Sequence, residues 1–129
     1  MDKLLLIYYP SCTTCQKAEK WLAERGIACE KRHIKEENPT AAELDIWAQK
    51  SGQPLTKFFN TSGMLYRSLE LKEKLPGMTR QEQLEMLASS GMLVKRPLLI
   101  GNDGEDFVLI GFRPAQWEAA LDDKVQPDT

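Results

Sequence analysis

The chain has 129 residues, a length that suits one domain with a full hydrophobic core. Its 42% hydrophobic and 28% charged residues exclude a disordered chain, and three cysteines are too few for a disulfide-dense secreted scaffold. A formal charge of -2 excludes a strong global attraction to nucleic acid or to an anionic membrane. The longest apolar run, residues 4–7, is too short to span a membrane, and no secretory signal pattern is visible. We therefore expect a cytoplasmic protein with no direct nucleic-acid or membrane partner.

The first third of the chain has the pattern of a strand, a helix and a second strand. Residues 3–9 are mostly apolar without alternation, as in a buried strand. Thr13 and Gln16 have capping-box spacing and predict a helix start, and Gly26 supplies a stop. Residues 27–34 predict a second strand. Because only a helix separates the two strands, they should lie parallel as a right-handed βαβ unit.

The middle of the chain is predicted to be helical. Thr40 and Glu43 repeat the capping-box spacing, and Gly52 marks the end of that helix. Residues 54–75 contain apolar residues punctuated by Asn, Ser and Gly, which indicates short helices joined by turns. A further helix is expected within residues 79–91, again from a capping box to a glycine.

The last third predicts a hairpin followed by a helix. Residues 97–100 and 107–110 resemble short strands that flank a Gly-Asn-Asp-Gly turn, so they should pair antiparallel. Pro114 suits the first turn of a final helix. We expect a single domain over residues 1–121 and a short polar tail over residues 122–129.

Two cysteines flank the predicted start of the first helix. Cys12 precedes it, where free backbone N–H groups and the helix dipole stabilise an anion, and Lys17 adds a positive charge one turn later. The pKa of Cys12 should therefore be depressed, which favours its nucleophilic thiolate. Cys15, three residues further on, is placed to attack a mixed disulfide on Cys12 and so to act as the resolving thiol.

The alternative for these cysteines is half of a structural zinc site. Cys29 and His33 are the only candidates for the second half, and on a strand they share one face. Nothing in the pattern brings that face to the helix start. Redox or nucleophilic chemistry is therefore favoured, we expect no metal, and neither Cys29 nor His33 is assigned a role.

A second candidate feature is the Lys95-Arg96-Pro97 sequence before a predicted strand. An X-Pro bond there tolerates the cis form, which we predict, although a trans turn is the common alternative. A guanidinium can hold a tetrahedral oxyanion by two hydrogen bonds, so Arg96 and Arg113 could form an oxyanion pocket if both lay beside the thiolate. The sequence alone leaves open whether they converge or are solvated surface residues.

Taken together, several segments resemble the bacterial arsenate reductase family of the glutaredoxin-coupled type, which includes Spx-type regulators and related thiol reductases. The resemblance covers nearly the whole chain and is carried by residues 9–15, Pro39-Thr40, residues 58–63, residues 95–97 and Gly111-Phe112.

The resemblance implies an α/β, thioredoxin-like fold: a mixed four-stranded sheet with a helical insertion between the βαβ half and the C-terminal β-hairpin half. It further implies Cys12 as nucleophile, Arg96 as an oxyanion contact and Pro97 as a cis proline. Arg113 matches the family less specifically and joins Arg96 as a candidate contact.

This chain also departs from the true reductases of that type. It has Tyr8-Tyr9-Pro10 where they usually have His-Asn-Pro before the cysteine, and it has Asn60, a third candidate substrate contact, where they place another arginine. We therefore expect a weaker grip on an oxyanion. Cys15 is often not a cysteine in those reductases but is one in the Spx-type group, which favours an internal disulfide.

Two functions follow as hypotheses. The first is a monomeric thiol-dependent oxidoreductase that acts on an oxyanion such as arsenate or on a thiol or disulfide, with no bound cofactor and with glutathione and glutaredoxin, or thioredoxin, as reductant. The second is an Spx-type redox sensor that binds RNA polymerase without turnover. Spx-type regulators continue further at the C-terminus than this chain, which favours the first hypothesis.

Overall fold

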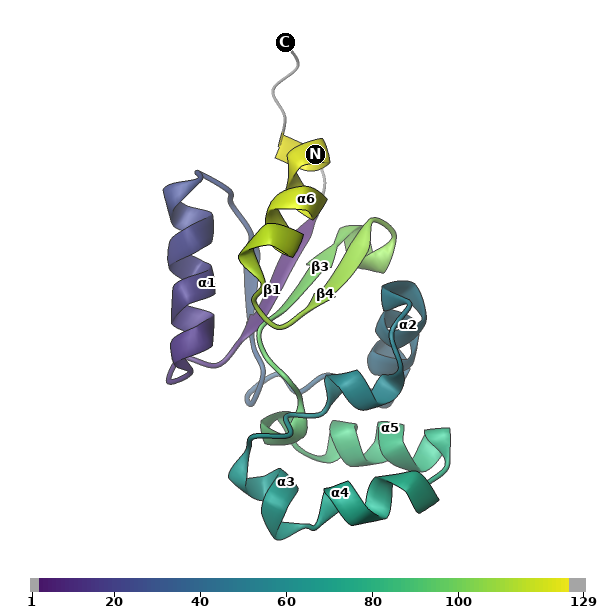
Figure 1. Cartoon of the computed structure of the whole chain (residues 1–129). Helices are drawn as coiled ribbons and strands as arrows, with labels where there is room; N and C mark the ends of the chain where they lie inside the picture. Colours follow the sequence, from purple (N-terminus) through teal and green to yellow (C-terminus); the bar gives the residue numbers. More distant parts are fainter. Residues whose placement is uncertain (1–2, 126–129) are drawn as a thin grey trace.

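The protein is built on a mixed four-stranded sheet (Figure 1). The structure, a computed structural model, describes residues 3–125, with side chains described for residues 3–121. The strands β1 (Leu4–Tyr8), β2 (Glu30–His33), β3 (Leu98–Gly101) and β4 (Phe107–Ile110) lie in the order β2-β1-β3-β4. β1 and β2 are parallel, and the other two pairs are antiparallel. The predicted βαβ unit and the predicted hairpin are both confirmed.

One face of the sheet is covered by α1 (Thr13–Glu24) and α6 (Pro114–Val125), which lie on the same side of the sheet in Figure 1. Alternating side chains of the strands, with Leu6 and Leu99 at the centre, point to this face and pack against Leu22 of α1 and Trp117 of α6. The Trp117 indole N–H donates to the carbonyl oxygen of Gly111, so even its polar atom is satisfied in the core.

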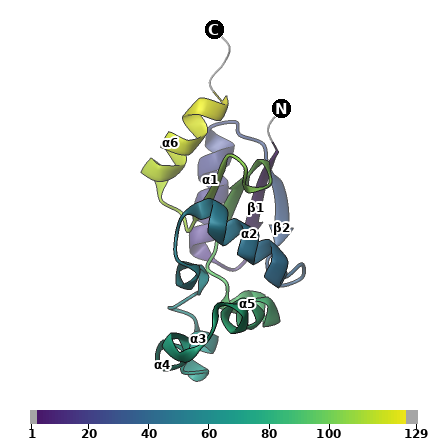
Figure 2. The same cartoon turned by 90° about the vertical axis from the view of Figure 1, so that its right-hand side faces the viewer.

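The other face packs against α2 (Ala41–Ser51), and α5 (Arg80–Ser89) packs against α2 within the same hydrophobic cluster. Ile7, Leu98 and Val108 point to this face, because strand residues two apart share a side. A helical insertion then lies between the two halves of the sheet, as predicted, and it extends away from the sheet below α2 in Figures 1 and 2. Its elements are η1 (Leu55–Phe58), α3 (Met64–Ser68), α4 (Leu71–Lys74), η2 (Leu75–Gly77), α5 and η3 (Gly91–Leu93).

Two of the three predicted capping boxes are present. Thr40 and Glu43 form a complete capping box at the start of α2, and Thr79 and Glu82 form another at the start of α5. In each box the threonine hydroxyl accepts from a backbone N–H of the first turn, and the glutamate accepts from the backbone N–H of the threonine. Both helices therefore begin where the sequence predicted.

The capping box predicted for Thr13 and Gln16 is wrong. The N-cap of α1 is Cys12, one residue before Thr13, and its side chain makes no capping hydrogen bond. The side-chain amide of Gln16 instead donates to the Pro10 carbonyl oxygen.

Some element bounds also differ from the prediction. β2 begins at Glu30 and not at residue 27, because only the stretch opposite β1 is paired. α6 continues through Val125, four residues into the expected tail, and residues 126–129 lie outside the described part of the chain. A short helical turn, η4 (Asn102–Gly104), joins β3 to β4. None of the helices within residues 3–125 is long and apolar enough to cross a membrane.

Candidate functional site

The site begins where β1 ends and the chain turns into α1. The backbone N–H of Cys12 donates to the carbonyl oxygen of Tyr9 at 3.0 Å, which closes the turn. Gln16 ties the same loop to α1 through its 2.8 Å hydrogen bond to Pro10. Cys12 occupies the N-cap position with extended backbone angles, so its side chain faces the free N–H groups of the first helical turn.

The surroundings of Cys12 favour its thiolate. Burial alone would raise the pKa of this half-exposed thiol. The backbone N–H groups of Cys15 and Thr14, the thiol of Cys15 and the charge of Arg96 favour the thiolate and outweigh burial, so the pKa of Cys12 is lowered. The predicted depression is therefore present, but its source differs in part. Lys17 is exposed and is not among the groups that shift the pKa of Cys12.

Cys15 has the opposite character. It is completely buried in the first turn of α1, and its sulfur accepts a hydrogen bond from the backbone N–H of Tyr9 at 3.5 Å. Burial, together with the hydrogen bond to Cys12 and the negative charge on Cys12, raises its pKa to about 12. No disulfide joins the two cysteines, and the opposite shifts of their pKa values make Cys12 the easier of the two to ionise.

Arg96 reaches this pair from the start of β3. The Arg96–Pro97 peptide bond is cis, as predicted from the sequence. The guanidinium lies 5.3 Å from the centre of the Tyr9 ring, and its Nη1 donates to the carbonyl oxygens of Met92 and Val94, each at 3.3 Å. These contacts hold the positive charge within electrostatic reach of both sulfurs.

Two chain segments meet beside Arg96 and bring Asn60 into the site. The backbone N–H of Asn60 donates to the carbonyl oxygen of Leu93 at 2.8 Å, and the N–H of Lys95 donates to the carbonyl oxygen of Phe58 at 2.7 Å. The side-chain amide of Asn60 donates to the carbonyl oxygen of Met92, the same acceptor that Arg96 uses. Asn60 therefore lies next to Arg96, with one of its amide hydrogens directed at the protein backbone.

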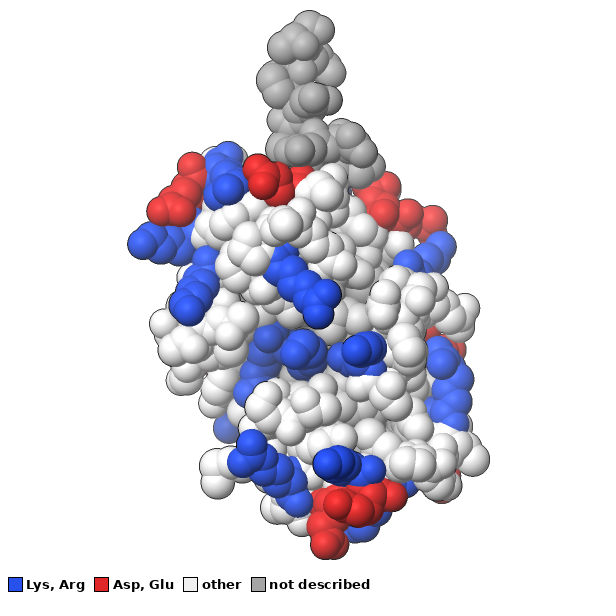
Figure 3. Space-filling model, in the orientation of Figure 1, with Lys and Arg blue, Asp and Glu red and all other residues white. Residues whose placement is uncertain are grey.

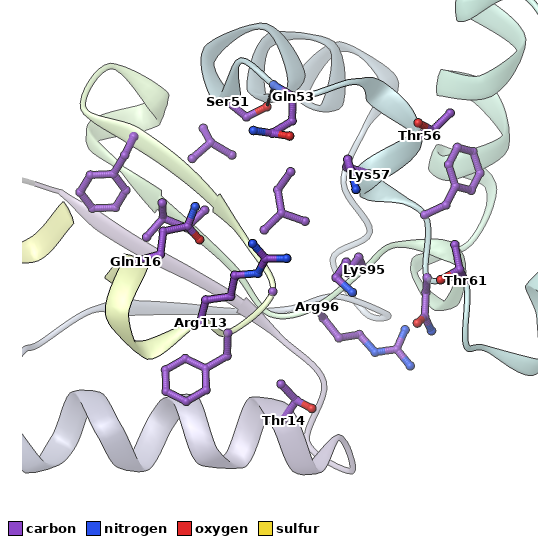
Figure 4. Close-up of a pocket in the computed structure, with 18 of the residues that line it drawn as sticks. Thr14, Ser51, Gln53, Thr56, Lys57, Thr61, Lys95, Arg96, Arg113 and Gln116 are labelled. Atoms are coloured by element: carbon purple, nitrogen blue, oxygen red, sulfur yellow. Dashed lines mark hydrogen bonds between the residues drawn. The ribbon is translucent and has the colours of Figure 1, made fainter. Parts of the chain in front are cut away.

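A cleft of about 800 Å³ opens beside Cys12 and is lined by positive side chains. Figure 3 shows lysine and arginine side chains gathered across the middle of this face of the molecule. In the close-up of Figure 4, Arg113 extends into the cleft from the start of α6, opposite Lys95 and Lys57, while Arg96 turns toward Thr61. The structure thus brings Cys12, Asn60, Arg96 and Arg113 to one cleft, although Arg113 enters from the side opposite Arg96.

Three lysines that line the cleft, Lys50, Lys57 and Lys95, were not predicted as site residues. Lys95 could have been predicted as a site residue, because it directly precedes Arg96 in the Lys95-Arg96-Pro97 sequence. Lys57 reaches the cleft only because η1 leads into the segment that pairs beside Val94, a pairing far apart in sequence.

Cys29 and His33 lie away from the cleft. Cys29 packs at the edge of the core formed with α1 and α6, and burial raises its pKa. His33 contacts the rings of Tyr8 and Tyr9, and its Nδ1 accepts backbone N–H groups from Lys35 and Glu36. Within the described residues, no three His, Cys, Asp or Glu side chains gather as a metal site would require.

Comparisons with known proteins assign this arrangement to a family. The sequence profile of the ArsC family matches residues 7–120. The chain is 54% identical over 115 residues to the uncharacterized protein YusI of Bacillus subtilis, covering 89% of this chain and 95% of YusI. It is 32% identical over 117 residues to the regulatory protein MgsR of the same organism, covering 90% of this chain and 89% of MgsR.

A solved structure gives the same answer for the fold. The crystal structure of a putative ArsC family related protein from Bacteroides fragilis superposes with a TM-score of 0.86 at 52% identity, covering 92% of this chain and 97% of that one. The thioredoxin-like fold, the cysteine pair at the start of α1 and the match over almost all of the chain agree. This chain belongs to the ArsC family.

Proposed function

We propose that this protein is a thiol–disulfide oxidoreductase in which Cys12 is the nucleophile and Cys15 the resolving thiol. The observation that carries the proposal is the opposite shift of the two thiol pKa values at one helix start. A half-exposed thiolate next to a buried, protonated thiol is the arrangement that two successive thiol exchanges require.

The reaction proceeds in two exchanges. The Cys12 thiolate attacks one sulfur of a disulfide substrate, a Cys12–substrate bond forms, and the other half of the substrate leaves as a thiolate. Cys15 then loses its proton and attacks the Cys12 sulfur, which releases the second substrate thiol and leaves a Cys12–Cys15 disulfide. Two electrons from glutathione with glutaredoxin, or from thioredoxin, restore both thiols.

The site is arranged so that the second exchange follows the first. Two causes of the raised pKa of Cys15 are its hydrogen bond to Cys12 and the negative charge on Cys12. Both disappear once Cys12 is in a mixed disulfide, while Arg96, whose charge lowers the pKa of Cys15, remains. Cys15 therefore becomes easier to deprotonate only after Cys12 has reacted.

The first test separates the two cysteine roles. Without added thiol, the pre-reduced wild type should reduce one equivalent of bis(2-hydroxyethyl) disulfide and end as the Cys12–Cys15 disulfide. Under the same conditions Cys12→Ser should not react, and Cys15→Ser should stop at a mixed disulfide visible by mass spectrometry. Cys29→Ser serves as the matched control and should keep wild-type turnover. An active Cys12→Ser variant would exclude Cys12 as the nucleophile.

Arsenate is a second substrate class, with Arg96, Arg113 and Asn60 as the proposed oxyanion contacts. An arginine in place of Asn60 adds a charge-assisted hydrogen bond, which contributes about 1.5–3 kcal/mol. We therefore expect Asn60→Arg to raise arsenate reduction roughly ten- to hundredfold and Arg96→Ala to reduce it. Equal rates in wild type and Asn60→Arg would show that the missing arginine does not limit the reaction.

The alternative function is an Spx-type redox sensor that binds RNA polymerase. It is favoured by the similarity to MgsR, which is named a regulatory protein. A pull-down of RNA polymerase with the oxidised and the reduced protein, run beside the turnover assay, separates the two functions. Polymerase capture that depends on the Cys12–Cys15 disulfide, without turnover, would favour the sensor.

A further inference from the structure

The cleft beside Cys12 follows the free edge of the sheet. β4 is the last strand in the order β2-β1-β3-β4, and within the described residues no strand pairs with its outer side. Every residue from Asp106 to Arg113 lines the cleft, so the cleft extends along the whole of β4. An unpaired strand edge presents backbone N–H and C=O groups that can pair with another extended segment.

The register identifies which backbone groups face the cleft. The N–H of Gly111 donates to the carbonyl oxygen of Pro97, and opposed residues of antiparallel strands alternate between bonded and non-bonded pairs. Leu109 therefore exchanges hydrogen bonds with Leu99. Val108 and Ile110, the residues between, direct their N–H and C=O groups away from β3 and toward the cleft.

Positive charge surrounds this edge. Lys57, Lys95 and Arg113 extend toward the cleft from η1, from the segment before β3 and from the start of α6 (Figure 4). None of these three side chains forms an ion pair with a carboxylate in the described part of the chain, whereas Lys50 at the far end pairs with Glu105 at 3.3 Å. Asp106 is the single acidic residue among the described lining residues. The edge therefore attracts negative charge although the chain has a net charge of -2.

We propose that the free edge of β4 binds an extended, acidic segment of a partner protein and delivers an oxidised cysteine of that segment to Cys12. The inference rests on the proposed thiol–disulfide function and specifies its substrate. β4 has four residues, so it pairs with a segment about 13 Å long. Backbone pairing with Val108 and Ile110 supplies affinity for any extended sequence, and the three cations select acidic side chains.

The segment enters the reaction as a mixed disulfide. Cys12 attacks the sulfur of the partner's cysteine, the smaller thiol leaves as a thiolate, and the partner becomes joined to Cys12. Cys15 then displaces the partner's cysteine as a thiol and closes the Cys12–Cys15 disulfide. Glutathione with glutaredoxin, or thioredoxin, supplies the two electrons for the next cycle, as in the proposed function.

Selection by charge can be measured with two synthetic heptapeptides. One alternates Glu with Val and the other alternates Lys with Val, and each ends in a cysteine that carries a neutral 2-pyridyl disulfide. With the full chain at low salt, Cys12 should displace 2-thiopyridone from the acidic peptide at least about tenfold faster than from the basic peptide. This difference in rate should shrink as salt is added. Lys57→Gln should reduce the difference, and Lys72→Gln, on the exposed surface of α4, should not. Equal rates for the two peptides would overturn the proposal.

Backbone pairing has its own readout. In the Cys15→Ser protein joined to the acidic peptide, amide hydrogen exchange should slow at least about tenfold at Val108 and Ile110 and stay unchanged at Leu109, whose N–H already bonds to β3. Unchanged exchange at Val108 and Ile110, or equal reactivity of an acidic peptide N-methylated at alternate amides, would show that the edge is not used.

A neutral disulfide separates this proposal from the function on which it rests. Wild type and Lys72→Gln, whose substitution lies outside the cleft, should reduce bis(2-hydroxyethyl) disulfide at the same rate. If that reduction proceeds while the peptides are not distinguished, the docking surface is refuted and the oxidoreductase stands. If the neutral disulfide is not reduced either, the thiol–disulfide function itself is refuted.

Discussion

Gly91 lies where three segments meet, and replacing it with alanine should strongly destabilise the protein. A Cβ atom at this position would clash with the Ile34 carbonyl oxygen and would lie 2.8 Å from the Ile34 carbonyl carbon and 2.7 Å from Oδ1 of Asn38. Ordinary contacts begin at 3.4 Å, so the chain has to move. Two of the three neighbours are backbone atoms and cannot turn away as a flexible side chain could.

The loss in the free energy of unfolding depends on which hydrogen-bonded groups the alanine would displace. The N–H of Ile34 is fixed to the carbonyl oxygen of Tyr8 at 2.8 Å, and Nδ2 of Asn38 donates to the carbonyl oxygen of Ala88 at 2.8 Å. Overpacking of this kind costs about 1–3 kcal/mol, and leaving the partly buried Ala88 carbonyl without its donor costs up to about 1–3 kcal/mol more. Because relaxation relieves part of both, we expect a loss of about 2–4 kcal/mol in the free energy of unfolding.

Urea unfolding of Gly91→Ala beside Gly77→Ala tests this reasoning. A Cβ atom at Gly77 would have no other atom within 4 Å, and Gly77 has no positive φ, so its alanine variant should be unchanged or more stable by about 0.4–1 kcal/mol. For a domain of this size, the loss at Gly91 corresponds to a fall in Tm of roughly 6–15 °C. A Gly91→Ala protein within about 0.5 kcal/mol of wild type would refute the steric argument.

Two electrostatic predictions follow. Arg96→Gln should raise the pKa of Cys12, because the guanidinium charge is one of the causes that lower this pKa. Lys17→Gln should leave the pKa of Cys12 unchanged. The pH dependence of iodoacetamide labelling of Cys12 measures the pKa in both variants. Arg32 donates hydrogen bonds to both carboxylate oxygens of Glu43, at 2.8 Å each, and these bonds lower the pKa of Glu43. The stability that the ionised Glu43 adds to the folded protein is therefore fully present above the ordinary carboxyl pKa, and it is lost as the pH falls through the lowered pKa. Glu43→Gln should therefore weaken the acid dependence of stability, by about 1 kcal/mol or less because the pair is partly exposed; an unaltered acid dependence would contradict the assignment.

The order and type of the elements were largely predictable from local patterns, and one failure shows the limit of such patterns. Thr40 with Glu43 and Thr13 with Gln16 have the same spacing, yet only the first pair forms a capping box. At the second, the chain leaves β1 through a tight turn that places the N-cap one residue before Thr13. Gln16 then bonds the turn at Pro10 and not the N-cap. The spacing of two residues therefore predicts a capping box only where the turn before the helix allows the first of them to be the N-cap residue.

The two cysteines of the site and their roles could be predicted from the sequence, but the lysines that line the cleft could not. Cys12 and Cys15 are neighbours on one helical turn, so their relationship follows from local geometry. Lys57 reaches the cleft only because Phe59, the residue after η1, pairs with Val94 before β3. A contact between residues so far apart in sequence depends on the topology, which leaves no periodic pattern in the sequence.

The two backbone hydrogen bonds that join residues 58–60 to residues 93–95 fix both ends of the helical insertion. The entropy of closing a loop rises slowly with length, by about 0.6 kcal/mol per doubling. Helices between these fixed ends can therefore be lengthened, shortened or exchanged at small cost, provided that buried side chains such as Leu71 and Leu75 find new partners. Evolution, or a protein engineer, can vary this region among descendants of one ancestor while Arg96 keeps its place beside the sulfurs.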